Sequence, residues 1–220
     1  MNQLIIFTIT LLIFLSCSPF TTSNLQSAKL INKGKWEYTP SVTNFSLKHF
    51  ESTHYGIQIA NGLNEKLNFR LRLERMKFGF SHLSFGLKYK LNNPEYYSSI
   101  YLPITLTKYD NEFLELYPIR EIFPNNNDNI LIQLEPTYIN SYNISFIDIY
   151  LDIDTSTKAF IPINNSLRGL LLGYNLGFGI SSNPSKWVIR PECSLTVLFT
   201  QHSFDLFDTP QLSIGLSIYP

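Results

Sequence analysis

A histidine and a serine lie two residues apart in the segment His82–Leu83–Ser84. Residues i and i+2 of a β-strand point to the same face, so the imidazole could take the proton of the hydroxyl and make it a nucleophile. With a carboxylate to orient the histidine, this is the arrangement that a Ser–His-type hydrolase uses. Whether a substrate can reach the pair depends on the strand that carries it.

A second set of residues could act through charge alone. Basic and acidic side chains alternate with apolar ones, which gathers the charges on one face of each strand. These residues are Arg70, Arg72, Glu74, Lys88, Lys90, Glu135, Asp148, Asp152, Asp154, Arg190 and Glu192. In a narrow interior, the arginines at 70 and 72 are expected to form ion pairs with the aspartates at 148, 152 and 154. In an aqueous pore, the same charges would be solvated separately.

The sequence gives little support for nucleotide, metal or nucleic-acid chemistry. The chain has no P-loop, G-x-S-x-G, H-E-x-x-H or C-x-x-C motif, and no two of its four histidines have the spacing of metal ligands beside a carboxylate. Lys plus Arg and Asp plus Glu are 17 each, so the net charge is zero and a nucleic-acid partner is excluded. We therefore predict a protein without metal or cofactor, and without enzymatic activity.

The elements that must position these side chains are β-strands. Apolar residues recur at every second position, as in Leu83, Phe85, Leu87, Tyr89 and Leu91, and turn signals such as Asn92–Asn93–Pro94 separate the runs. This pattern predicts an all-β fold, a closed antiparallel barrel of about ten strands within a range of 8–12. The expected strands are 35–46, 53–60, 66–76, 82–91, 97–108, 130–139, 144–159, 168–180, 187–200 and 211–219.

The length of the apolar faces favours a transmembrane barrel over a soluble sandwich. Five or six alternate apolar positions match the ~9–11 residues with which a strand crosses a membrane. The polar faces include Gly173, Gly177 and Gly179, which would make room inside a narrow barrel. We therefore expect the polar faces to line the lumen. In the alternative, a soluble lipocalin-like protein that binds an apolar ligand, the two faces would be reversed.

The N-terminus has the form of a lipoprotein signal. An apolar run over Leu4–Leu15 ends at Ser16–Cys17, and the segment Phe14–Leu15–Ser16–Cys17 resembles a bacterial lipobox. We predict a signal peptide over 1–16, lipid on Cys17, a polar tether over 17–33, and a single barrel domain over 34–220. Lipidation at Cys17 would leave Cys193 as the only free thiol.

Most of the mature chain resembles the outer-membrane β-barrel proteins of Bacteroidota-type bacteria, in particular their short members with a lipoprotein signal. The matching stretches are Cys17–Ser18–Pro19, Lys33–Gly34–Lys35, Tyr55–Gly56–Ile57–Gln58, 62–72, 175–180, 187–192 and the alternating apolar C-terminus. The resemblance implies a lipid-anchored protein of the bacterial outer membrane, with membrane lipid and the barrel-assembly machinery as partners. It supplies no activity and no oligomeric state.

The pair of His82 and Ser84 resembles the H-x-S pair of outer-membrane lipid A deacylases, which makes a lipid-acting hydrolase an alternative function. Strand parity places the pair on the lumen side, away from an acyl substrate in the membrane. The favoured function is therefore a structural or small-solute barrel with a narrow charged lumen.

Overall fold

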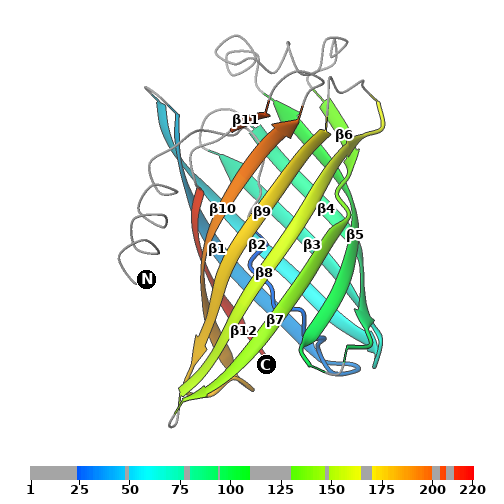
Figure 1. The fold of residues 1–220 in the computed structure, drawn as a ribbon, viewed down its shortest axis with the longest axis vertical. Helices are drawn as coiled ribbons and strands as arrows, with labels where there is room; N and C mark the ends of the chain where they lie inside the picture. The colour runs from blue at the N-terminus through cyan, green and yellow to red at the C-terminus, as the bar shows by residue number, and fades with distance from the viewer. Residues whose placement is uncertain are drawn as a thin grey trace.

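The computed structural model describes residues 24–47, 50–76, 80–93, 95–109, 130–146, 149–164, 170–199, 204–206 and 211–220. The strands within these residues wind into one closed barrel (Figure 1). They are β1 (Trp36–Leu47), β2 (Phe50–Asn64), β3 (Leu67–Met76), β4 (Phe80–Leu91), β5 (Tyr97–Tyr109), β6 (Ile130–Leu134), β7 (Thr137–Phe146), β8 (Ile149–Pro162), β9 (Leu170–Ser181), β10 (Trp187–Phe199), β11 (Phe204–Leu206) and β12 (Gln211–Ile218).

All pairings in the wall are antiparallel, and the pairing of β1 with β12 closes the barrel. Two positions in the wall are shared by two short strands. β6 and β7 both lie between β5 and β8, and β11 and β12 both pair with β10. The twelve segments therefore make 12 − 2 = 10 barrel strands, which confirms the predicted all-β fold class and strand number.

The predicted strands near residues 130–150 are divided differently in the structure. The expected turn near residues 140–143 is strand, and the chain reverses where Phe146 pairs with Ile149. This stretch looked like a turn because the inner face of β7 is polar, as the buried Ser141 illustrates. The expected strand over 130–139 is interrupted at Pro136, which has no N–H to donate, although the register on both sides is unchanged.

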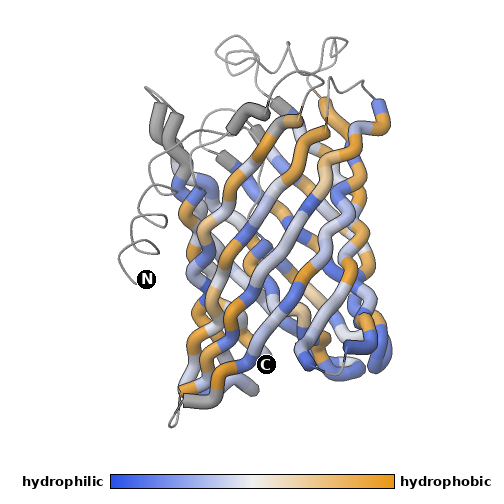
Figure 2. The backbone as a smooth tube through the Cα atoms, viewed as in Figure 1, coloured by the Kyte–Doolittle hydropathy of each residue, from blue (hydrophilic) through white to orange (hydrophobic). Residues whose placement is uncertain are grey.

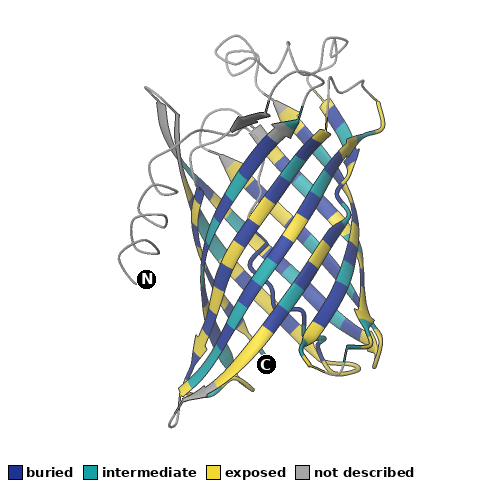
Figure 3. Ribbon diagram, in the orientation of Figure 1, coloured by how far each residue is buried: buried dark blue, intermediate teal, exposed yellow. Residues whose placement is uncertain are grey.

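The direction of the side chains confirms the sequence-based assignment of inside and outside. Along each described strand, hydropathy and burial alternate together (Figures 2 and 3). Arg70 and Lys88 are among the largest fully buried side chains, whereas Leu102 and Leu212 keep more than half of their surface exposed. The described strands thus have a polar interior and an apolar exterior, the reverse of the lipocalin-like alternative.

The two ends of the barrel differ. At the lower rim of Figure 1 lie the start of β1, the turn at 65–66, the turn at 182–186 and the C-terminus; the upper rim holds the ends of β3 and β5. Exposed aromatic side chains gather on the outer surface near the lower rim, with the rings of Trp36 and Tyr38 stacked 6.4 Å apart. The described residues contain no helix long and apolar enough to span a membrane.

Candidate functional site

The interior of the barrel holds the N-terminal part of the described chain. Residues 24–33, here called the luminal segment, run from the middle of the lumen down to the lower rim (the blue chain inside the barrel in Figure 1). Its residues from Asn24 to Ala28 are all buried. The sequence predicted a tether over 17–33, but the part of it that the structure describes lies within the lumen.

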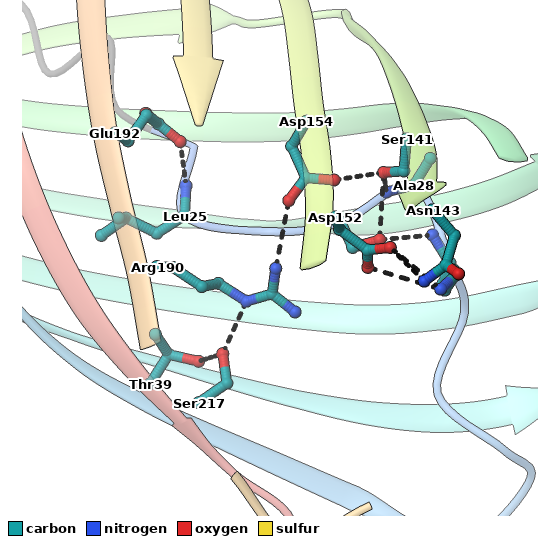
Figure 4. A network of polar contacts seen from close by, with 12 residues as sticks. Leu25, Ala28, Thr39, Ser141, Asn143, Asp152, Asp154, Arg190, Glu192 and Ser217 are labelled. Carbon is teal, nitrogen blue, oxygen red and sulfur yellow. Dashed lines mark hydrogen bonds and ion pairs between the residues drawn. The ribbon is translucent and has the colours of Figure 1, made fainter. Parts of the chain in front are cut away.

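The upper part of the luminal segment is held by its backbone. The carboxylate of Glu192 on β10 accepts hydrogen bonds from the N–H groups of Asn24 and Leu25, the latter at 2.7 Å (Figure 4). The hydroxyl of Ser141 on β7 accepts the N–H of Ala28 at 2.6 Å. A buried segment without regular structure needs such partners because its polar backbone groups have lost water.

The opposite wall supplies the complementary contacts. The ammonium of Lys88 on β4 donates to the carbonyl oxygens of Ser27 and Lys29, the latter at 3.0 Å. Asn68 on β3 faces the backbone of Ile31, and in the amide orientation that satisfies both groups its oxygen accepts the Ile31 N–H at 2.8 Å. The luminal segment is therefore hydrogen-bonded by carboxylate, hydroxyl, amide and ammonium groups from four strands.

Of the two lysines in the luminal segment, Lys29 and Lys33, Lys29 forms an ion pair with the wall. Its ammonium donates to Asp152 on β8 at 3.2 Å and to the hydroxyl of Tyr150 at 2.9 Å. It also lies over the rings of Tyr97 and Tyr150, 4.8 and 4.7 Å from their centroids. Asp152 is fully buried, so Lys29 neutralises a carboxylate that would be costly to leave unpaired.

The segment leaves the lumen at the lower rim through a close contact with β2. The N–H of Gly34 donates to the Gly62 carbonyl at 2.7 Å, and the Gly62 N–H donates to the Lys35 carbonyl at 3.0 Å. A Cβ at position 62 would lie 2.2 Å from the carbonyl oxygen of Asn32, so only glycine fits there. Two cavities of about 380 and 450 Å³ lie beside the segment at this end.

Ion pairs within the wall hold most of the remaining charges. Arg70 pairs with Glu37 at 2.8 Å, Lys158 with Glu135 at 3.1 Å, and Arg72 donates from Nε to Glu74 at 2.9 Å. Of the aspartates expected to pair with Arg70 and Arg72, the two that the structure describes have other ion-pair partners: Asp152 pairs with Lys29, and Asp154 with Arg190. Inner side chains of the same, adjacent or next-but-one strand are closer than those across a barrel whose centre is already occupied.

Arg190 on β10 links the wall to the luminal segment. It donates to Asp154 at 3.2 Å and to the Ser217 hydroxyl at 2.9 Å, and Asp154 in turn accepts from Ser141, which holds Ala28 (Figure 4). At the lower rim, Arg190 also donates to Tyr219, whose hydroxyl donates to Glu37 at 3.0 Å. Burial, with Glu37 acting in the same direction, raises the pKa of Tyr219 to about 12, so the phenol stays a donor.

Of the sequence-predicted lumen residues that the structure describes, all but Lys90 are buried in the interior. Lys90 is exposed near the lower rim, beside one of the two cavities there. Asp148 and Cys17 lie outside the described residues. Sequence reasoning missed Glu37, Lys158 and Lys29; the first two have the inward parity of their strands, but Lys29 lies in a segment without any periodic pattern.

His82 and Ser84 also face the interior, as strand parity predicted. The side chain of His82 is buried, and its Nδ1 lies 3.2 Å from the hydroxyl of Thr107 on β5. Ser84 is buried as well and hydrogen-bonds Tyr101. Neither side chain reaches the outer surface. In the described residues, no group of three His, Cys, Asp or Glu side chains is placed to hold a metal ion.

Comparison with known proteins does not assign this barrel to a family. No protein-family model and no curated protein matches this sequence. The fold and the filled lumen are therefore the basis on which a function must be argued.

Proposed function

We propose that this protein is a non-enzymatic lipoprotein of the bacterial outer membrane, whose barrel spans the membrane and is closed by its own N-terminal segment. The observation that carries the proposal is the inverted burial. Charged side chains such as Arg70, Glu37 and Asp152 have almost no exposed surface, while the outward positions are occupied by Leu, Ile, Phe and Tyr. A water-soluble barrel would gain nothing from this arrangement, whereas a lipid environment requires it.

Two further features support a membrane-spanning role. Pairing of β1 with β12 closes the sheet on itself, so the backbone hydrogen bonds along the body of the barrel are made between strands, as the hydrocarbon region demands of any β-structure. The outward aromatic side chains near the lower rim, including Trp36, Tyr38 and Tyr89, match the girdles that such barrels place at a membrane interface.

The filled lumen favours a structural barrel over a channel for small solutes. The luminal segment occupies the lower half with direct hydrogen bonds to four strands. Above it, side chains from neighbouring strands, among them Arg72, Glu74 and Glu135, are buried against one another. We infer that the barrel is closed to ions in this state.

Neighbouring residues of β9 provide a direct test of the membrane assignment. Leu176 lies near the middle of the strand and points outward with 46% of its surface exposed, so Leu176→Arg should destabilise a membrane-inserted barrel by about 2–4 kcal/mol. In water the same change would cost little. The free energy of unfolding from phospholipid vesicles, together with heat-modifiable migration on gels, measures the effect.

The control is Gly177→Ala, one residue further along and on the inner face. Its Cβ would lie 3.5 Å from the nearest atoms, an ordinary contact, so this variant should fold as the wild type does. Equal tolerance of both substitutions would argue against membrane insertion.

The lipid anchor can be tested separately, at a residue outside the described part of the chain. If the segment ending at Ser16–Cys17 is a lipobox, the mature protein should incorporate a palmitate analogue and Cys17→Ala should abolish the labelling. Cys193→Ala serves as the control and should label normally. Labelling that persists in Cys17→Ala would contradict the assignment.

A further inference from the structure

Where the structure describes its side chains, the outward face of the barrel is almost free of charge, and the two exceptions lie together at the upper rim. Among the outward-facing strand residues whose side chains the structure describes, only Arg75 near the end of β3 and Lys108 near the end of β5 are charged. Both are exposed and both are cationic. Charges that take part in the internal network are all on the other face of the sheet.

Strand register brings these two cations to the same level. Arg75 pairs with Ser81 on β4, and Ser81 pairs with Lys108 on β5, so only a serine separates them. Adjacent strands are about 4.8 Å apart, which puts the two backbones about 9.6 Å from each other. The long side chains of Arg and Lys can therefore reach one group between them, with the serine hydroxyl as a further donor.

The row immediately below, toward the middle of the barrel, is entirely apolar. Leu73, Leu83 and Leu106 pair with one another in this order, and Ile57 and Ile132 continue the row on either side. Residues of both rows line an open groove of about 590 Å³ on the outer surface. Glu74 also borders the groove, but its side chain points inward to Arg72.

We propose that this groove binds a membrane lipid with a phosphate-bearing headgroup. The phosphate lies between Arg75 and Lys108, with Ser81 as a donor, and an acyl chain lies along the apolar row below. Charge complementarity supports the headgroup, since no acidic side chain is described on the outward faces of the strands. The apolar row supports a lipid rather than a free phosphate ion. The inference rests on the proposed membrane-spanning function.

The test uses the full chain folded in detergent and lipid A, a phosphorylated and multiply acylated disaccharide, as the probe. Native mass spectrometry gives the affinity for lipid A, for the same lipid after removal of its phosphates, and for phosphatidylcholine. Wild-type protein should prefer phosphorylated lipid A, and Arg75→Gln and Lys108→Gln should each weaken its binding about fivefold, the effect of one basic residue near an anionic surface. The double variant should lose the preference.

The matched control is Lys66→Gln with Lys186→Gln, which removes two exposed cations from the turns of the lower rim. It should bind lipid A as the wild type does. An equal loss in this control, or equal affinity of the wild type for lipid A with and without phosphates, would overturn the proposal. Insertion into phosphatidylcholine vesicles is measured in parallel: a barrel that inserts but shows no phosphate preference refutes the lipid site alone, whereas one that fails to insert refutes the membrane-spanning function.

Discussion

Deletion of residues 24–31 should convert a closed barrel into an ion-conducting one. In planar lipid bilayers, the full-length protein is expected to show no current steps, because the luminal segment fills the lower lumen and its backbone is bonded to Glu192, Ser141 and Lys88. Without the segment, these polar groups would be hydrated, and water in the lower lumen would reach the charged side chains above, among them Arg72, Glu74 and Glu135. Hydration of those charges as well would complete a water path through the barrel. The deletion variant should therefore give stable, ohmic steps, the largest functional change that the structure predicts.

A point substitution provides an intermediate case that keeps the chain intact. Glu192→Gln retains one acceptor oxygen but loses the charge and the second acceptor that hold Asn24 and Leu25. It should produce brief openings rather than a steady current. Heat-modifiable migration shows whether each variant is folded. Steady conductance of the full-length protein at the level of the deletion would mean that the segment does not close the lumen, and would favour solute passage.

The sequence predicted the wall of the barrel well because each strand has two unlike environments. Leu71 and Leu73 point outward while Arg70 and Arg72 point inward, and this contrast produces a period of two that can be read without a structure. The prediction failed where the two faces of a segment differ little in polarity. The polar inner face of β7 resembled a turn, and Pro136 interrupts the single strand that the sequence predicted over 130–139.

The luminal segment could not be predicted in the same way. Its contacts use backbone N–H and carbonyl groups, which almost every residue has, so they do not require particular residue types in the segment. The signal was present in the wall: Glu192 and Lys88 both have inward parity, and in the structure both bind backbone groups of the segment. Their partners could not be inferred from sequence, since strand tilt and shear decide which inner residues meet.

The ion pairs between buried charges lead to a second prediction, which concerns the stability of the barrel. Arg70 and Glu37 are each only 2% exposed and lie 2.8 Å apart. Arg70→Met would leave the Glu37 carboxylate buried without a cationic partner of its own, hydrogen-bonded to Tyr219 and Ser217, and should lower the free energy of unfolding by about 3–5 kcal/mol. Glu37→Gln should be costly for the same reason, because it leaves the guanidinium without its counter-charge.

The double variant distinguishes a buried pair from two independent charges. When both partners are replaced, neither charge is left uncompensated, so Arg70→Met with Glu37→Gln should recover much of the loss, with a coupling energy of about 0.5–3 kcal/mol. The control cycle combines Arg72→Met with Asp152→Asn. Arg72 pairs with Glu74 and Asp152 with Lys29, so these two effects should add within about 0.5 kcal/mol.

Denaturant unfolding of the folded barrel in vesicles measures both cycles under the same conditions. Coupling confined to Arg70 and Glu37 would show that the charges act as local pairs in a poorly hydrated lumen, where the effective dielectric constant is low. Additivity in both cycles would mean that water screens each charge separately. That outcome would contradict the closed lumen independently of the conductance measurement, because a barrel that screens its inner charges must contain a continuous body of water.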